Sequence, residues 1–293
     1  MRFTTLSAAV LVFAFAVAPG APAKAPNILF ILSDDHALEA IGAYGSWLKD
    51  YVKTPAIDRL AAEGMRFTNV CCNNSICSPS RAAIITGQYS HVSGGLNLNC
   101  SLREDAPSYN RQLRKAGYQT AVVGKWHMRH TPRGMDFYSV TKGQGSYFNP
   151  SFTSTGDKQS KHKGYYADVY TDVALEWLKK RDRKRPFCLN LHFKGPHHPY
   201  DYPDRHEGLF ADKLVPEPPS LHEDVERTSP LLKAPHRWHL LRNYGYFGRH
   251  ENDSKPKMWP HDGSARSKTS AAYQHMIHKY IRCVAAIDEN IKR

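Results

Sequence analysis

Hydrophobic and polar positions along the chain follow two periods, and this pattern predicts strands and helices in turn. Short apolar runs of strand length, such as residues 27–33, end in polar or charged side chains. Other segments repeat apolar residues at three- and four-residue spacing, which is typical of helices that cover one face of a sheet. The predicted strands are residues 27–33, 65–70, 118–123 and 186–193, and the predicted helices are residues 55–63, 79–86, 107–116, 168–180 and 270–293.

The alternation of these elements predicts an α/β fold with a mostly parallel central sheet and helices on both of its faces. In such a sheet, ligands bind beyond the carboxyl ends of the strands. Polar clusters follow three of the predicted strands at this point, at residues 34–36, 125–127 and 194–198. Residues 201–268 show little periodicity and are rich in Pro, His, Arg and Tyr, so we expect long surface loops or a subdomain there.

The N-terminus has the order of a secretory signal peptide. Arg2 precedes an apolar stretch over residues 6–18, and small residues follow it at 21–23. We therefore expect a signal peptide over residues 1–23 and one domain over residues 24–293, with an uncleaved anchor as the alternative. No later segment is long and apolar enough to form a stable membrane span.

Export would place the chain in a secreted or periplasmic location, which is oxidising. Pairing among the six cysteines is then possible, but the sequence does not assign it. With 293 residues, 41% of them hydrophobic, the chain can bury one substantial core, and its net charge of +13 favours anionic partners. Charge alone does not choose among an anionic substrate, an acidic glycan, a membrane and nucleic acid.

The stretch CSPSRAAIITG, residues 77–87, carries the most specific chemistry. We expect Ser78 to cap a helix that begins at Pro79, which places Cys77 at the positive end of the helix dipole with Arg81 one turn further on. A plain alternative is a disulfide from Cys77 to another cysteine, either Cys71, Cys72 or Cys100. A zinc site lacks a second ligand pair at suitable spacing, and a thiolate phosphatase would need its arginine further along the loop.

This stretch resembles the sulfatase signature of cysteine, any residue, proline, any residue and arginine, followed by a Thr-Gly helix end. Three further segments, NILFILSDDH, GYQTAVVGKWH and HFKGPHHPY, resemble the other site motifs of that family and occur in the same order. The resemblance covers about residues 26–293, and it implies an alkaline-phosphatase-like fold with the activity of a sulfuric ester hydrolase.

The resemblance also implies how residue 77 is modified. A formylglycine-generating enzyme or another sulfatase-maturing enzyme would oxidise Cys77 to formylglycine. One hydroxyl of the hydrated aldehyde attacks sulfur, and the other collapses back to expel sulfate, so the nucleophile has its own exit route. A calcium ion would be held by Asp34, Asp35 and residue 77.

Four further residues receive roles from the same resemblance. Arg81 would stabilise the deprotonated hydroxyl of residue 77. Lys125 and His127 alternate along an extended segment, so we expect both to point toward the sulfate. His197 would bind the sulfate or protonate the leaving alcohol. Read from local sequence alone, Arg81 also suits a surface ion pair, Lys125 and His127 an exposed loop, and His197 a histidine-rich loop. Asp34 and Asp35 likewise suit a helix cap or turn.

The substrate class rests on a weaker likeness. The segments GQGSYFNP, residues 164–200 and the closing AAIDENIKR are similar to the branch that acts on 6-sulfated N-acetylglucosamine in glycosaminoglycans and mucins. The implied partner is a sulfated carbohydrate and not a nucleic acid. Two alternatives stay open: a phosphodiesterase or phosphonate hydrolase of the same superfamily, and an inactive or incomplete chain that binds sulfated glycans.

The sequence departs from the family at its end. Sulfatases usually continue into a strand ending in Asp-Asn-Gly or Asp-His-Gly that completes the calcium site, then another active-site lysine and a smaller C-terminal domain. None follows here, and HDGSAR at residues 261–266 has no apolar strand before it. We therefore expect an incomplete calcium site and an uncovered edge of the sheet, as in a fragment, a truncated reading frame or a chain completed by another polypeptide.

Overall fold

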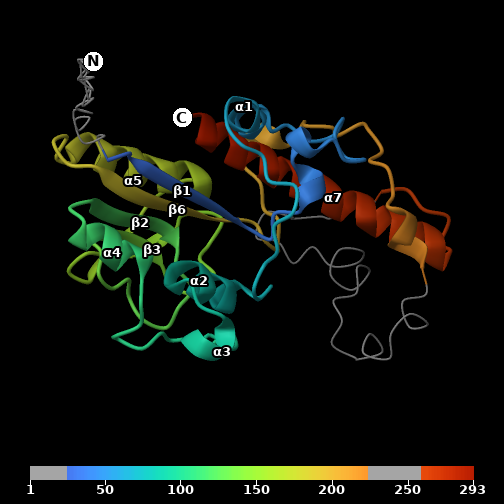
Figure 1. Ribbon diagram of the computed structural model, residues 1–293. Helices are drawn as coiled ribbons and strands as arrows, with labels where there is room; N and C mark the ends of the chain where they lie inside the picture. Colours follow the sequence, from blue (N-terminus) through green and yellow to red (C-terminus); the bar gives the residue numbers. More distant parts are fainter. Residues whose placement is uncertain (1–24, 224–258) are drawn as a thin grey trace, which may run out of the picture.

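The computed structural model describes residues 25–223 and 259–293, and a six-stranded sheet runs through it (Figure 1). The order across the sheet is β1-β6-β2-β3-β4-β5. Neighbours from β1 to β3 are parallel, whereas β4 and β5 are added in antiparallel fashion. The strands are β1 (Ile28–Asp34), β2 (Gln119–Lys125), β3 (Phe137–Thr141), β4 (Ser151–Ser154), β5 (Lys158–Lys161) and β6 (Phe187–Pro196).

Helices cover both faces of this sheet, as the sequence predicts. The α-helices are α1 (Pro55–Glu63), α2 (Cys77–Thr86), α3 (Ser90–Ser93), α4 (Tyr109–Lys115), α5 (Tyr166–Lys180) and α7 (Ala265–Lys292). Short 3-10 helices form at η1 (Leu38–Ala40), η2 (Gly42–Tyr44), η3 (Asp204–His206) and η4 (Pro219–His222). Figure 1 shows α5 over one face, with α2 and α4 against the other.

The alternation of side chains along β2 explains this arrangement. Val123 belongs to a core cluster with Tyr170 of α5 and Ile287 of α7. Its neighbour Val122 points to the opposite face and packs in a separate cluster with Ile85 of α2. Because successive residues of a strand face opposite sides, a continuous apolar run must be covered twice.

Helix α7 ties the C-terminal part of the chain to the segment that follows β1. Ile281 of α7 packs in a third cluster with Leu48. Further along the helix, the carboxylate of Asp288 accepts hydrogen bonds from the main-chain amides of Ala56, at 3.0 Å, and Ile57, at 2.8 Å. These are otherwise unpaired amides in the first turn of α1, so α7 caps that helix.

One edge of the sheet is formed by β1, which pairs only with β6 among the described strands. Leu29 on this strand is 52% exposed. None of the helices in residues 25–223 and 259–293 is long and apolar enough to cross a membrane.

Several sequence-based expectations about elements are wrong. Residues 65–70 form no strand, and the side chains of Met65 and Val70 are 78% and 76% exposed. Local preference for an extended chain does not produce a strand without a partner to pair with. Strands β3, β4 and β5 were not predicted from the sequence, because they are short and interrupted by turns.

The start of α2 also differs from the prediction. The helix begins at Cys77 rather than at Pro79, and Ile76 occupies the N-cap position. Ser78 therefore lies inside the helix, where its hydroxyl donates to the main-chain oxygen of His127 at 2.6 Å. Instead of capping α2, Ser78 joins it to the segment that follows β2.

The predicted irregular region, residues 201–268, is only partly described. It contains η3 and η4, and α7 begins inside its predicted limits. The segment HDGSAR leads into α7, which begins at Ala265, and Ser264 caps the helix by accepting a hydrogen bond from the amide of Ser267. Residues 224–258 and the predicted signal peptide lie outside the described residues.

Candidate active site

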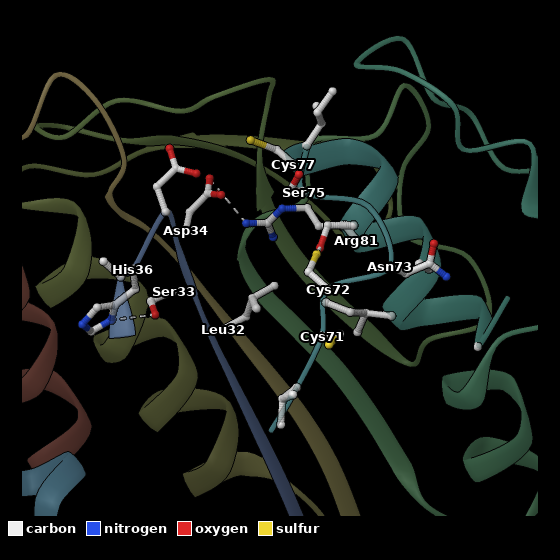
Figure 2. Close-up of a pocket in the computed structure, with 18 of the residues that line it drawn as sticks. Leu32, Ser33, Asp34, His36, Cys71, Cys72, Asn73, Ser75, Cys77 and Arg81 are labelled. Carbon is white, nitrogen blue, oxygen red and sulfur yellow. Dashed lines mark hydrogen bonds and ion pairs between the residues drawn. The ribbon is translucent and has the colours of Figure 1, made fainter. Parts of the chain in front are cut away.

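Three buried charged side chains meet where β1 and β2 end. Asp34 is the last residue of β1, Lys125 is the last residue of β2, and Arg81 comes from α2. The ammonium of Lys125 donates to the carboxylate of Asp34, and Nη2 of Arg81 lies 3.6 Å from the same oxygen. Figure 2 shows Asp34 and Arg81 pointing toward each other across one end of a pocket.

This environment keeps Asp34 ionised. Burial by itself would raise the pKa of Asp34, but the positive charges of Arg81 and Lys125 lower it below its usual value. Lys125 has a second acceptor, the side-chain oxygen of Gln144. Two fixed cations thus share one carboxylate, which leaves an excess positive charge suited to an anion.

A histidine that the sequence analysis gave no role orients Arg81. Nη1 of Arg81 donates to the main-chain oxygen of Lys125 at 2.6 Å and lies 3.2 Å from Nδ1 of His192. Because a guanidinium can only donate, this contact needs Nδ1 of His192 as an acceptor, whereas the main-chain oxygen of Lys125, 3.3 Å from the same nitrogen, would need it as a donor. Burial and the charge of Arg81 lower the pKa of His192 to about 3, so its ring is neutral.

Cys77 faces this charged group. It is the first residue of α2, and Figure 2 shows its sulfur directed toward Asp34. Burial and the Asp34 carboxylate raise the pKa of the Cys77 thiol. The unmodified side chain is therefore a protonated thiol near neutral pH, which does not suit the thiolate nucleophile of a phosphatase.

The disulfide alternative finds no support in the arrangement of the cysteines. All six lie within the described residues, and all six are unpaired. Cys71 and Cys72 are exposed, whereas Cys100 is buried in the core beside α2.

A candidate cation position lies between β1, α2 and the segment after β6. Ligand atoms of Asp34, Cys77 and His197 all lie within 4.8 Å of one another. Asp35 was predicted as the partner of Asp34, but its carboxylate lies to one side of this group, 3.7 Å from Nε2 of His197, and its side chain is 53% exposed. The set within 4.8 Å thus joins two of the predicted metal ligands, Asp34 and Cys77, to His197, which was predicted to act on the substrate.

The chemistry of these donors can be compared with the needs of calcium. Asp34 and Asp35 supply the hard oxygen ligands that calcium prefers, whereas the thiol of Cys77 is a soft donor. Replacing that thiol with the hydroxyls of a hydrated aldehyde would make residue 77 an oxygen donor. Once Cys77 is oxidised, the residues present would therefore fit part of a calcium site, with three residues offering oxygen donors where calcium takes about six to eight.

The two remaining predicted histidines approach the same charges. His127 has a φ of 55°, so the chain turns after β2, and the predicted extended alternation of Lys125 and His127 is wrong. Burial and the charge of Lys125 lower the pKa of His127 to about 4. Burial and Lys125 also lower the pKa of His197. Both rings are neutral near pH 7, and binding of an anion beside them would raise their affinity for a proton.

The pocket beside Asp34, Cys77 and Arg81 has a volume of about 940 Å³. Its wall is formed by the end of β1, the start of α2 and the segment that precedes α2, including Cys72 and Asn73 (Figure 2). Lys125, His127 and His197 do not line it, so they approach the charged group from another side. His36 lines this pocket, but Nδ1 of its ring is 2.9 Å from the hydroxyl of Ser33.

Three further residues support this site, and none of them received a role from the sequence. His192 contacts Arg81, Gln144 contacts Lys125, and the ammonium of Lys194 lies 4.9 Å from the centre of the Tyr147 ring. Lys194 is buried, and burial together with Lys125 lowers its pKa to about 8. The sequence carried a signal for His192 and Lys194, because polar residues at every second position interrupt the apolar run of β6. Gln144 lies in a loop and has no such signal.

Comparison with known proteins decides the family. The sulfatase family model matches residues 26–293. The chain belongs to the sulfatase family. This sulfatase is 34% identical over 307 residues to an N-acetylglucosamine-6-O-sulfatase from Bacteroides thetaiotaomicron, an alignment that covers 92% of the chain and 54% of the relative. It is 30% identical to human N-acetylgalactosamine-6-sulfatase, over 62% of the chain and 41% of that relative.

Solved structures agree with the fold of this sulfatase. One of them, in complex with its substrate D-glucosamine-2-N,6-O-disulfate, superposes with a TM-score of 0.82 and 30% identity, over 92% of this chain and 61% of that one. A sulfatase structure from Bacteroides fragilis, at 23% identity and a TM-score of 0.65, shows the fold alone. The chain spans about half the length of the relatives it matches.

Proposed function

We propose that this protein is an exported sulfuric ester hydrolase that removes sulfate from a sulfated sugar, with residue 77 as its nucleophile. The observation that carries the proposal is the convergence of Cys77, Asp34, Arg81 and Lys125 at the ends of β1 and β2. A 6-sulfated N-acetylglucosamine residue is the proposed substrate, in line with the name of the relative that is 34% identical.

Oxidation of Cys77 to formylglycine and binding of calcium would supply a hydrated aldehyde as nucleophile and a divalent charge for the sulfate oxygens. A sulfatase-maturing enzyme is then a required partner. Arg81 and Lys125 would hold the sulfate, because both are fixed cations that point at Asp34 from different elements. Asp34 and Asp35 would hold the calcium ion.

His197 is proposed to give a proton to the leaving alcohol. As the site stands, burial and Lys125 lower the pKa of His197, so the ring is neutral near pH 7. An anionic sulfate ester placed beside the ring would favour the imidazolium, which can then donate as the C–O oxygen develops negative charge. Proton transfer is thereby linked to the presence of the substrate.

Mass spectrometry of the tryptic peptide of residues 67–81, from protein made in its native host, tests the nucleophile directly. Oxidation of Cys77 would give a peptide about 18 Da lighter than the cysteine form. Fragmentation must place the change at residue 77, because Cys71 and Cys72 lie in the same peptide. A Cys77→Ser variant from the same host is the control, and an unmodified Cys77 in the unaltered protein would contradict the mechanism.

A second candidate function is calcium-independent binding of sulfated glycans without turnover. The net charge of +13 and the protonated thiol of unmodified Cys77 favour it. Binding to heparin that persists with a calcium chelator and in Cys77→Ala, together with no release of sulfate by the unaltered protein, would select this function. A panel of matched sulfate and phosphate esters separates the sulfatase from a phosphodiesterase or phosphonate hydrolase.

A further inference from the structure

The segment that follows β1 is held by a side chain from the other end of the chain. The hydroxyl of Tyr280, on α7, donates to the main-chain oxygen of Asp35 at 2.8 Å and accepts from the amide of Ala37 at 2.7 Å. The two hydrogen bonds bracket His36. One hydroxyl therefore fixes the main chain on both sides of a single residue.

Tyr280 is itself held firmly. It is only 9% exposed, and its ring packs edge-on against the ring of Tyr200 with centroids 5.5 Å apart. It sits next to Ile281, a fully buried residue of α7. The hydroxyl therefore has a defined position relative to the sheet and is not the end of a mobile surface side chain.

The conformation of Asp35 makes this support important. Asp35 has a φ of 58°, in the left-handed region that residues with a side chain seldom occupy. This turn directs its carboxylate to within 3.7 Å of His197, beside the group formed by Asp34 and Cys77. A relaxed, extended Asp35 would point its carboxylate in a different direction, because the side chain follows the main chain.

We propose that Tyr280 is a positioning residue that holds Asp35 in the conformation needed to bind the metal. The inference rests on the proposed function, in which Asp34 and Asp35 bind calcium. Tyr280 itself touches neither the metal position nor the substrate. It acts through the main chain of Asp35 and Ala37, in the way that groups behind a metal ligand set its direction.

Tyr280→Phe tests the proposal, because it removes one oxygen atom and keeps the ring. Tyr273→Phe is a matched control. Tyr273 is also a buried tyrosine of α7, and its hydroxyl donates to a main-chain oxygen, that of Pro216, at 2.7 Å. Terbium, a luminescent substitute for calcium, is titrated into the full chain carrying each change, with residue 77 oxidised in every sample. We expect affinity to fall about tenfold or more in Tyr280→Phe and to stay within about twofold of the unaltered protein in Tyr273→Phe.

Hydrogen exchange gives a second reading that does not depend on the metal. The Ala37 amide should exchange faster in Tyr280→Phe but not in Tyr273→Phe, because only the first change removes its acceptor. Equal terbium affinity in Tyr280→Phe and the unaltered protein would overturn the proposal. Equal weakening by both changes would also overturn it, since that result would assign the hydroxyls to general stability. Failure of Tyr280→Phe to fold would overturn it for the same reason.

Asp35→Asn separates this inference from the function on which it rests. If Asp35 is a ligand, Asp35→Asn weakens terbium binding, and adding Tyr280→Phe to it causes little further loss. Binding that is unchanged in Asp35→Asn would contradict the proposed ligand set itself. A loss in Asp35→Asn with none in Tyr280→Phe would contradict only the role of Tyr280.

Discussion

Lys125 shows how a single side chain can be both structural and chemical. It is fully buried, yet its ammonium has acceptors in the side chains of Asp34 and Gln144, so the charge is not isolated. A buried cation of this kind is stable because its partners are in place before any ligand arrives. An incoming sulfate would meet a charge that is already oriented, which is the condition for strong electrostatic stabilisation of a transition state.

We expect Lys125→Ala to lower kcat/KM for a sulfate ester by about a hundredfold or more, the scale observed when a group that stabilises transition-state charge is removed. The exposed Lys115→Ala, at the end of α4, is the control for loss of one positive charge. Steady-state kinetics of the matured protein give the comparison. Similar kcat/KM values for the two variants would mean that Lys125 serves only the folded state.

His197→Ala should affect substrates according to their leaving groups. An alkyl alcohol, as in N-acetylglucosamine 6-sulfate, needs a proton to leave, whereas 4-nitrophenol leaves readily as an anion. We therefore expect a loss of kcat/KM about tenfold larger on the sugar sulfate than on 4-nitrophenyl sulfate, within the usual contribution of general acid catalysis. Equal losses on both substrates would instead assign His197 to binding the sulfate.

At the scale of elements, the contact between β2 and β6 depends on Gly124. This residue precedes Lys125 and has a φ of 106°. A Cβ atom there would lie 2.1 Å from the main-chain oxygen of His192 and 2.7 Å from the ring of Tyr170. Neither neighbour can move freely, because one is the backbone of a central strand and the other is buried in the core.

Gly124→Ala should therefore destabilise the protein by more than about 2 kcal/mol, through backbone strain and overpacking combined. Gly117→Ala is the control, because Gly117 has a φ of 91° but no atom lies within 4 Å of the position that a Cβ would occupy there. Urea unfolding of both variants separates the clash from the cost of the left-handed conformation. Equal destabilisation by the two changes would show that the clash is relieved at little cost.

The sequence predicts most elements that have a strong period or a clear stop signal. Helix α1 ends before Gly64 as predicted, and the apolar runs of β1, β2 and β6 are confirmed. The errors occur where the outcome depends on tertiary contacts. Met65 begins a run of extended character that has no strand beside it, and β5 is exposed along its length, so no apolar pattern reveals it.

In the candidate site too, residues in local sequence motifs are predictable, and residues that depend on tertiary contacts are not. Asp34, Arg81 and Lys125 could be named from the sequence because each lies in a motif at the end of a strand or the start of a helix. Tyr280 and Gln144 could not, since their partners are distant in sequence and only folding brings them together. The turn at His127 was also invisible, because nothing in its local sequence requires a positive φ.

At the scale of the whole molecule, buried neutral histidines make the fold sensitive to acid. Burial is the main cause that lowers the pKa of His192 to about 3 and the pKa values of His127 and His198 to about 4. The unfolded chain, in which histidine titrates near 6.5, therefore binds more protons below that pH than the folded chain does. The stability that these groups contribute is complete above pH 6.5 and is lost as the pH falls toward 4.

We expect the free energy of unfolding to fall between pH 6.5 and 4, and we expect His192→Asn to reduce that slope. Asparagine keeps an acceptor for Arg81 but does not titrate. Urea unfolding at several pH values gives the slope, with the exposed His91→Asn as a control. A slope that His192→Asn leaves unchanged would show that His192 is not one of the groups responsible.

The hydrogen bond from Tyr280 to Asp35 joins residues that are 245 positions apart. This separation in sequence sets the delay between the synthesis of the two residues. Ribosomes add about 5–20 residues per second. Roughly ten to fifty seconds therefore separate the synthesis of Asp35 from that of Tyr280 at this rate. Cys77 is made early in this interval, before α7 exists to fix the segment after β1. If a sulfatase-maturing enzyme acts on Cys77 as proposed, the order of synthesis would give it a period in which residue 77 is still accessible on an unfinished chain.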